Sequence, residues 1–337
     1  MEALSTSDFD YTLPEEQIAQ GPPAERDGGR LLCLGRESEH QQIRDLPRFL
    51  PPNSLIVVND SKVIPARLAA RRASGGQVEV LLLERIGLTR WKAMVRASKQ
   101  LREQEVLEVD GGGAVCLSTT LKLGRAEVEL SDEALPWRVG AMPLPPYIQR
   151  PADAEDAKRY QTVYAREDGS VAAPTAGLHF TDALLGRLRA EGHEIVSVTL
   201  HVGPGTFVPV RVEDPDEHQM EQERYEVSED TARAISVAKS KGRPVIAVGT
   251  TVVRTLEASA ALAGEGRTEL FIRPGYRFRI VDGLVTNFHL PRSTLLMLVS
   301  ALAGREQVLA AYADAVKRGY RFYSYGDAML MTKQEKA

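Results

Sequence analysis

Four of the six histidines lie in short segments that also contain glycine, proline, threonine, asparagine or aromatic residues. These histidines are His179, His201, His218 and His289. Glycine and proline impose unusual backbone paths, and a histidine beside them supplies a group whose charge changes near neutral pH. The segments therefore predict a catalytic site carried on loops, in which imidazoles accept and donate protons.

A second polar group follows the strand that we predict at residues 54–58. This strand runs directly into Asp60, Ser61 and Lys62. In α/β folds ligands bind where loops leave the carboxyl ends of strands, so these three side chains are candidates for hydrogen bonds and charge pairing with a ligand. An ordinary turn is the alternative, because Asn, Asp and Ser are common turn residues.

The glycine-rich segment 203–206 matches neither of the common nucleotide-binding loops. A Walker loop needs Lys and then Ser or Thr after its last glycine, and a dinucleotide loop needs a third glycine that opens a helix. Here the residues after Thr206 continue as an extended segment. The segment instead offers a tight backbone path for a flat or polar ligand, with His201, Thr206 and Phe207 around it.

Thr250 and Thr251 begin a predicted helix directly after a predicted strand. Free N–H groups at a helix start favour negative charge, so this turn is a candidate site for an anion or a carboxylate. Helix capping by threonine explains the same residues equally well.

Metal binding and disulfide formation are both disfavoured. His218 with Glu221 and Glu223 is a weak metal signal, because no second histidine follows at helical spacing. Cys33 and Cys116 lie in apolar, strand-like segments without a C-x-x-C spacing. We therefore expect no metal, and structural thiols in a reducing cytoplasm.

The elements that must position these groups alternate between helix and strand in the second half of the chain, which predicts parallel strands with crossover helices. Thr181 and Ser228 are predicted N-caps. The aromatic segment 320–327 alternates like a strand. The predicted helices span residues 14–20, 182–191, 228–241, 252–263, 293–303 and 305–318, and the predicted strands of this part span 54–58, 194–202 and 244–249.

The segment between residues 66 and 136 has a different character. Strand-like runs at 77–83, 90–95, 105–109, 114–117 and 125–130 are broken by a glycine pair at 75–76 and a glycine triplet at 111–113. This pattern predicts an antiparallel sheet or small barrel, followed by a proline-rich linker up to residue 151. Between Arg67 and Arg102 there are nine Lys or Arg and two Glu, a local charge of +7. We expect this basic run to bind phosphate, although a solvated sheet face is the alternative. The RNA-binding candidates are Arg71, Arg72, Arg96 and Lys99.

Length and composition agree with two domains. The chain has 337 residues, 43% of them hydrophobic and 26% charged, and a net charge of −4. Such a composition is typical of a globular protein, and the charge gives no bulk attraction to nucleic acid. The polar N-terminus predicts no signal or membrane segment. We expect no membrane partner, no obligate protein partner and a cytoplasmic location.

Seven segments together resemble the bacterial S-adenosylmethionine:tRNA ribosyltransferase-isomerase family of queuosine biosynthesis, nearly from end to end. The segments are DFDYTLP (8–14), VNDSKV (58–63), APTAGLHF (173–180), HVGPGTF (201–207), VGTT (248–251), TNFHLP (286–291) and FYSYGDA (322–328). The resemblance implies an α/β fold with a larger domain related to β/α barrels, interrupted by a smaller all-β, barrel-like domain. On this basis we predict a catalytic domain at 1–62 and 152–337, with an insert and exit linker at 63–151.

The resemblance also implies the reaction. The ribosyl part of S-adenosylmethionine, acting as a co-substrate without a metal, is moved to 7-aminomethyl-7-deazaguanine at the wobble position of tRNA. There it becomes an epoxycyclopentane (epoxyqueuosine), and adenine and methionine are released. The implied partner is the tRNA anticodon stem-loop that carries the deazaguanine precursor.

From this chemistry we expect His179 and His201 to be the acid and base, and Asp60 and Lys62 to orient the ribose or the amine. Thr250 and Thr251 are expected to hold the methionine carboxylate. The further candidates for substrate binding are Ser61, Arg67, Thr175, Gly203, Gly205, Thr206, Phe207, Asn287, His289, Tyr323 and Asp327. Two rivals remain at this point: an S-adenosylmethionine-dependent RNA methyltransferase, and a non-catalytic RNA-binding protein.

Overall fold

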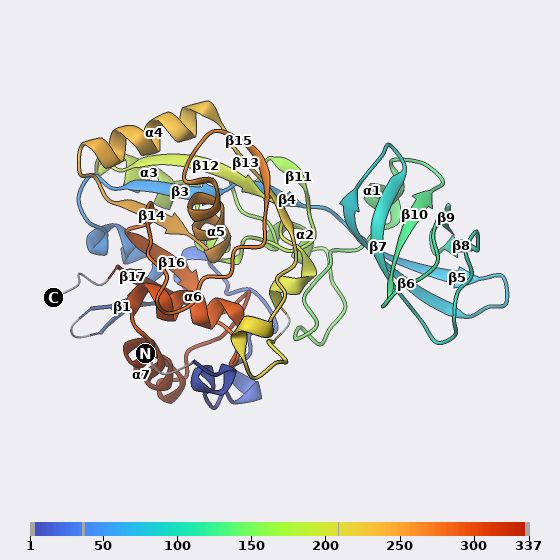
Figure 1. The fold of residues 1–337 in the computed structure, drawn as a ribbon, viewed down its shortest axis with the longest axis horizontal. Helices are drawn as coiled ribbons and strands as arrows, with labels where there is room; N and C mark the ends of the chain where they lie inside the picture. Colours follow the sequence, from blue (N-terminus) through green and yellow to red (C-terminus); the bar gives the residue numbers. More distant parts are fainter. Residues whose placement is uncertain (1–3, 36–37, 208, 334–337) are drawn as a thin grey trace.

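The structure, a computed structural model, describes residues 4–35, 38–207 and 209–333, without the side chains of Thr206 and Phe207. Figure 1 shows a larger body of helices and strands and, beside it, a smaller body made almost entirely of strands. The predicted α/β class with an inserted all-β domain is confirmed. The exact boundaries predicted at residues 62 and 152 stay predictions.

The larger body is built on one open, nine-stranded sheet. Its four central strands β12, β3, β14 and β16 are parallel, as the alternation of helix and strand predicted. The flanking pairs β12–β13, β13–β15, β16–β17 and β1–β2 are antiparallel, which the sequence did not predict. In spatial order the strands are β15 (Gly264–Thr268), β13 (Glu223–Val227), β12 (Glu194–Leu200), β3 (Leu55–Asn59), β14 (Val245–Val248), β16 (Gly283–Asn287), β17 (Ala328–Thr332), β1 (Arg30–Leu34) and β2 (Glu39–Gln42).

Helices cover this sheet and begin where their capping residues predict. Thr181 Oγ1 accepts a hydrogen bond from Leu184 N at 3.0 Å, and Ser228 Oγ accepts one from Thr231 N at 3.2 Å, so both predicted N-caps are confirmed. The α-helices of the larger body are α2 (Asp156–Arg159), α3 (Asp182–Ala190), α4 (Glu229–Ser240), α5 (Thr250–Ser259), α6 (Thr294–Ala303) and α7 (Arg305–Lys317). The 3-10 turns are η1 (Thr6–Phe9), η2 (Glu15–Gln17), η3 (Arg26–Gly28), η4 (Ile43–Phe49), η5 (Thr175–His179), η6 (Pro204–Phe207) and η7 (Pro215–Glu217).

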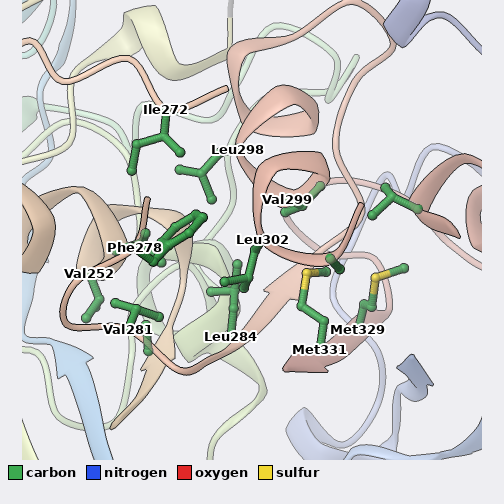
Figure 2. Close-up of a cluster of buried hydrophobic side chains, with 14 of the residues drawn as sticks. Val252, Ile272, Phe278, Val281, Leu284, Leu298, Val299, Leu302, Met329 and Met331 are labelled. Atoms are coloured by element: carbon green, nitrogen blue, oxygen red, sulfur yellow. The ribbon is translucent and has the colours of Figure 1, made fainter. Parts of the chain in front are cut away.

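The sheet is buried on both faces, and alternate residues of β3 show this directly. Leu55 and Val57 belong to a core shared with α4 to α7, whereas Ile56 and Val58 belong to a second core shared with α3 and η4. Figure 2 shows part of the first core, where Val252 of α5, Leu302 of α6 and Leu284 of β16 gather around Phe278 and Val281. Burial on both faces explains why these strands are continuous apolar runs.

Three predicted elements are wrong in type or length. The aromatic segment 320–327 is not a strand; β17 begins only at Ala328, after irregular backbone in which Tyr323 has a φ of +71°. The N-terminal helix is only the turn η2, because Ile18 instead bridges to Phe322. The helix predicted to reach residue 263 ends at Ser259, since Ala260 and Ala261 adopt left-handed φ values of 50° and 56°.

The smaller body is a closed, antiparallel barrel of six strands with its own hydrophobic core. The predicted strand-like runs are all present, and the sequence missed only the first strand, β5. The elements are β5 (Arg67–Arg72), β6 (Gln77–Arg85), β7 (Arg90–Ala97), β8 (Val106–Val109), β9 (Ala114–Leu117), β10 (Arg125–Leu130) and the short helix α1 (Leu135–Val139). Closure leaves no long sheet edge exposed, which stabilises a small all-β domain.

Two chain segments join the bodies. After β3 the chain forms β4 (Ser61–Val63), which pairs with β11 (Glu167–Ser170), and it then enters the barrel. The proline-rich linker returns from the barrel, and its Met142, Leu144 and Ile148 pack on Tyr160 and other residues of the larger body. Among the described residues, no single helix is long and apolar enough to span a membrane, and the bent pair α6–α7 meets that test only jointly.

Candidate active site

The predicted site residues gather at one edge of the large sheet. The parallel strands β3, β12, β14 and β16 end there, in front of Asp60, His201, Thr250 and His289. Strand β17 runs antiparallel to β16, with Asn287 opposite Ala328, so the segment that precedes β17 joins the same edge. Ligands of open α/β sheets bind at this edge.

A narrow cavity lies at this edge, with a volume of about 50 Å³. Six predicted site residues line it: Thr175, Thr250, Thr251, Asn287, His289 and Tyr323. The walls come from η5, Val202 after β12, the start of α5, the end of β16 with the chain up to the start of α6, the segment before β17, and Tyr147 of the proline-rich linker. A single chain region could not form this cavity, because its walls come from six segments that are far apart in the sequence.

The start of α5 forms one end of the cavity. Gly249 precedes the helix with a φ of +94° and a ψ of 150°, a conformation that side chains rarely adopt. The first N–H groups of a helix lack partners within the helix, and they attract negative charge. Thr250 and Thr251, both buried, stand on this first turn.

Asn59, which was not among the predicted site residues, holds this edge together. Its Oδ1 accepts hydrogen bonds from Ser61 N at 3.0 Å and Leu200 N at 3.1 Å. Its Nδ2 donates to Leu200 O at 3.0 Å and lies 3.4 Å from Thr251 Oγ1. The side chain therefore ties the ends of β3 and β12 to the first turn of α5, and its position in the Asn59–Asp60 turn was the available signal.

A wide cleft of about 1050 Å³ separates the barrel from the larger body and shares Val202 with the narrow cavity. His201 and Gly203 line the cleft, together with charged residues of both bodies. Two ion pairs connect its sides, Arg125–Glu221 and Arg267–Glu84. The cleft is therefore polar and wide, whereas the cavity is narrow and largely apolar.

His201 is the imidazole that faces the cleft. Arg224 Nη2 lies 3.2 Å from its Nε2, and because a guanidinium can only donate, Nε2 accepts. Burial first, and then the Arg224 charge, lower the pKa of His201. A Cβ on Gly169 would lie 2.9 Å from Nδ1, so the ring rests on a position that needs glycine. The lowered pKa favours the neutral form of His201, with its Nε2 beside the Arg224 guanidinium.

His179 and His289 are buried, and His179 does not line the cavity or the cleft. Burial lowers the pKa of His179 to about 4, despite nearby Asp327 and hydrogen bonds to Asn287 and to the Arg26 backbone. Burial lowers the pKa of His289 to about 3, and its Nε2 lies 3.0 Å from Thr286 Oγ1. The structure therefore does not bring His179 and His201 into one pocket, and their roles as acid and base stay predictions.

Asp60, Ser61 and Lys62 lie near the edge but outside the walls of the cavity and the cleft. Asp60 accepts hydrogen bonds from Thr199 Oγ1 at 2.7 Å and from Arg166 Nη2 at 2.9 Å. Ser61 Oγ lies 2.9 Å from Ser170 Oγ, and Lys62 pairs with Asp168 at 3.3 Å. These contacts hold β3 and β4 in place, and Ser61 and Lys62 lie in a strand, so the turn alternative is wrong in form. The roles of Asp60, Ser61 and Lys62 towards a ligand stay predictions.

The remaining predicted residues are dispersed. Arg67 pairs with Glu79 at 2.6 Å and, with Gly205, lines a third cavity of about 600 Å³ beside the linker. Asp327 is buried and accepts hydrogen bonds from Arg30 N and Arg321 N, both at 2.8 Å, so it shapes the segment before β17. The side chains of Thr206 and Phe207 lie outside the described residues.

The basic run on the barrel is balanced by acids from later strands. Arg71 pairs with Asp110 at 3.0 Å, and Arg72 makes a two-bond contact with Glu105 at 2.6 and 3.0 Å. Arg96 lies 3.9 Å from Glu79. Residues 67–139 contain twelve Lys or Arg and ten Asp or Glu, a net charge of only +2. The predicted one-sided patch is therefore much weaker in the folded barrel.

Other site residues were not predicted at all. Tyr147, Ser324, Leu290 and Leu295 line the cavity, and only the aromatic ring of Tyr147 in a proline-rich segment was a usable signal. Glu223 lines the cleft, forms a buried ion pair with Arg254 and accepts from Gly203 N at 3.4 Å. Its carboxylate thus holds the loop after His201.

Metal ligands do not cluster in the described part of the chain, where no group of three or more His, Cys, Asp or Glu side chains has the arrangement of a metal site. Both cysteines are free thiols, with Cys33 buried.

We predict that the free energy of unfolding decreases as the pH is lowered below about 6.5. Unfolded histidine binds a proton there, whereas His179 and His289 stay neutral until about pH 4 and pH 3. Each group contributes about 1.4 kcal/mol per pH unit in that window. Urea unfolding between pH 7 and pH 5 measures the slope, and a His179→Gln/His289→Gln variant should lose most of it. An unchanged slope in this variant would contradict the prediction.

Known proteins resemble this chain along nearly its whole length. The family described as "Queuosine biosynthesis protein" matches residues 6–331. A relative from Anaeromyxobacter dehalogenans, named S-adenosylmethionine:tRNA ribosyltransferase-isomerase, is 54% identical, covering 98% of this chain and 100% of its own length. A relative of the same name from Pelotomaculum thermopropionicum is 50% identical, covering 97% and 100%.

A solved structure extends the similarity to the fold. The crystal structure of S-adenosylmethionine tRNA ribosyltransferase from Thermotoga maritima is 38% identical and has a TM-score of 0.55. The match covers 96% of this chain and 99% of that one. The resemblance seen in seven sequence segments is thereby confirmed, and the chain belongs to the queuosine biosynthesis protein family.

Proposed function

We propose that this chain transfers and isomerises the ribosyl moiety of S-adenosylmethionine onto 7-aminomethyl-7-deazaguanine at the wobble position of tRNA. The products are epoxyqueuosine in tRNA, adenine and methionine. The observation that carries the proposal is the junction at the sheet edge, where a narrow cavity ending on a helix start opens beside a wide cleft that holds a neutral histidine. Family membership supports the same reaction.

The chemistry requires proton transfer in two directions. The sulfonium of S-adenosylmethionine acidifies the neighbouring C5′ protons, so a base near neutral pKa can remove one of them, and the departing adenine needs a proton or a hydrogen-bond donor. His201 suits the role of the base, because its lowered pKa keeps it unprotonated. The aminomethyl nucleophile must also be neutral to attack, and Arg224 and Arg267 in the cleft would lower its pKa.

The methionine end of the co-substrate fits the start of α5. Its carboxylate would receive the free N–H groups of the first helical turn and the hydroxyls of Thr250 and Thr251. The cavity is narrow, with a volume of about 50 Å³, so we expect its walls to adjust when the co-substrate binds. The C5′ carbon would face Val202 and the cleft, where His201 lies.

We place the wobble nucleotide of the tRNA in the wide cleft. A wobble nucleotide is unpaired, and RNA-modifying proteins splay such bases into pockets by stacking and phosphate contacts. Arg71, Arg72, Arg96 and Lys99 are the proposed contacts to the anticodon stem, and they lie on the barrel outside the lining of the cleft. The free thiols suit a reducing cytoplasm, where we place the reaction.

An isotope assay tests the reaction. Precursor tRNA is incubated with the protein and with donor labelled separately in ribose and in the methyl group. We expect ribose label in tRNA together with free adenine. Methyl label in tRNA would indicate the methyltransferase instead, and neither label would leave a non-catalytic RNA-binding protein.

We predict that His201→Ala lowers adenine release about 10²- to 10⁴-fold, as loss of an acid–base group usually does. Because the neutral form is the active one, kcat/KM of the wild type should fall below the lowered pKa of His201, on the acid side of pH 6.5. His218→Ala, a change at a histidine that lines neither the cavity nor the cleft, is the control. Activity of His201→Ala within a few-fold of wild type would exclude His201 as the base.

The RNA contacts can be separated from barrel stability by charge reversal. We predict that Arg96→Glu with Lys99→Glu lowers tRNA affinity and reduces the slope of log affinity against log salt by about one to two. Arg72→Glu should instead destabilise the barrel, because Arg72 and Glu105 are less than one-fifth exposed. Filter binding from 50 to 300 mM salt and thermal melts measure both effects. An unchanged salt slope would remove these residues from the tRNA contact.

A further inference from the structure

The amide of Asn287 is held in one orientation at the floor of the narrow cavity. Asn287 ends β16 and is 2% exposed. Its Nδ2 donates a hydrogen bond to Tyr323 O at 2.9 Å and lies 3.2 Å from His179 Nε2. Exchange of the amide nitrogen and oxygen would place Asn287 Oδ1 against the Tyr323 carbonyl, which is unfavourable. The oxygen therefore points away from both partners.

His179 contacts the amide nitrogen of Asn287. Because Asn287 Nδ2 can only donate, His179 Nε2 must accept, and the ring proton must then lie on Nδ1. The hydrogen bond of His179 to the Arg26 backbone agrees with a proton on Nδ1. A charged imidazole would present N–H on both sides and would repel the amide. His179 is thus suited to orient Asn287 and unsuited to exchange protons with a ligand.

The backbone of Tyr323 fixes the third side. Its φ of +71° is unusual for a residue with a side chain, and its carbonyl also accepts a hydrogen bond from Gly326 N at 2.9 Å. The Tyr323 ring packs on Tyr147, with the ring centroids 4.6 Å apart. Such backbone conformations persist only where the surroundings hold them, and they cluster at ligand sites.

The amide oxygen of Asn287 makes no hydrogen bond to the described residues. Asn287 Oδ1 is buried and has no hydrogen-bond partner among the described residues, while Asn287 forms part of the cavity wall. A buried acceptor without a partner is costly, so a ligand that supplies a donor gains affinity there. A neutral amide oxygen is better matched by an uncharged donor than by an ammonium group, whose burial needs an opposite charge.

We propose that Asn287 Oδ1 accepts a hydrogen bond from an uncharged N–H or O–H donor of the sulfonium co-substrate, and that His179 is the positioning residue that holds the amide for this contact. The donor is either the exocyclic amine of the adenine or a ribose hydroxyl. The inference rests on the proposed function, because it takes S-adenosylmethionine as the ligand. It makes Asn287 a specificity residue, since a ligand without the donor leaves the oxygen unpaired.

Calorimetric titration without tRNA tests the contact apart from catalysis. The ligands are S-adenosylmethionine, its 6-oxo analogue and its 2′-deoxy and 3′-deoxy analogues, each with wild type and Asn287→Ala. Relative to S-adenosylmethionine, we expect one analogue to bind about ten- to hundredfold more weakly to the wild type and less than threefold more weakly to Asn287→Ala. That analogue identifies the donor. Equal losses in both proteins for every analogue would overturn the proposal.

Variants of His179 test its positioning role. His179→Ala should weaken S-adenosylmethionine binding and lower the discrimination against the same analogue, whereas His179→Gln, whose amide oxygen can accept from Asn287, should restore part of it. His193→Gln is the matched control, because His193 is also buried and lines a separate surface pocket. Full discrimination in His179→Ala would overturn the positioning role.

Two further measurements keep the result decisive. If Asn287→Ala does not fold, Asn287→Ser takes its place in the titrations. In ¹⁵N-labelled wild type, the His179 ring should show a proton on Nδ1 and none on Nε2, with and without ligand. A proton on Nε2 would overturn the proposal. If the wild type binds and converts S-adenosylmethionine but Asn287→Ala loses as much affinity for every analogue as the wild type does, only this inference is refuted. If the wild type does not bind S-adenosylmethionine, the proposed function is refuted as well.

Discussion

The parallel alignment of four strands is the constraint on which the site depends. Strands β12, β3, β14 and β16 are held in register by backbone hydrogen bonds, so their carboxyl ends must share one edge. Segments that are far apart in the chain, after Asn59, Leu200, Val248 and Asn287, therefore meet in space. The reversed direction of β17 adds the segment before Ala328 to the same edge. No loop alone carries the site, and the sheet brings its parts together.

Local patterns in the sequence were sufficient to locate helices and strands of this scaffold, but not to predict which strands pair or in which direction. Apolar runs located β3 and β14, and Thr181 and Ser228 located two helix starts, because these signals depend on neighbouring residues. The antiparallel strands β13, β15 and β17 were not predicted. Pairing direction depends on contacts between residues that are distant in the chain, and no local pattern records it. The aromatic segment 320–327 failed for a related reason, since its alternating rings pack into the core from irregular backbone.

The charge of the barrel surface could not be predicted from the local sequence either. Between Arg67 and Arg102 the chain is strongly basic, yet antiparallel pairing places Arg71 beside Glu108 and Asp110, and Arg72 against Glu105. Arg90 pairs with Glu127 in the same way, across β7 and β10. Exposed pairs of this kind add little stability, but they cancel the field that a run of like charge would produce. A charge run in a predicted strand therefore indicates a binding surface only after its partner strands are known.

The histidines show why residue type could locate the site but not assign the roles. His179, His201 and His289 look equivalent in sequence, since each lies in a segment of glycine, proline and aromatic residues. Burial separates them. His179 and His289 are enclosed and paired with Asn287 and Thr286, whereas His201 faces the cleft beside Arg224.

This division has a chemical consequence for the proposed reaction. A bound sulfonium is a cation, and a cation near His201 lowers the pKa of the ring further, which favours the neutral form. The same field weakens His201 as a base and makes the imidazolium that forms when the ring takes a proton a stronger acid. In the proposed reaction, removal of a proton from C5′ would therefore leave an imidazolium that can protonate the departing adenine, unless another donor supplies that proton.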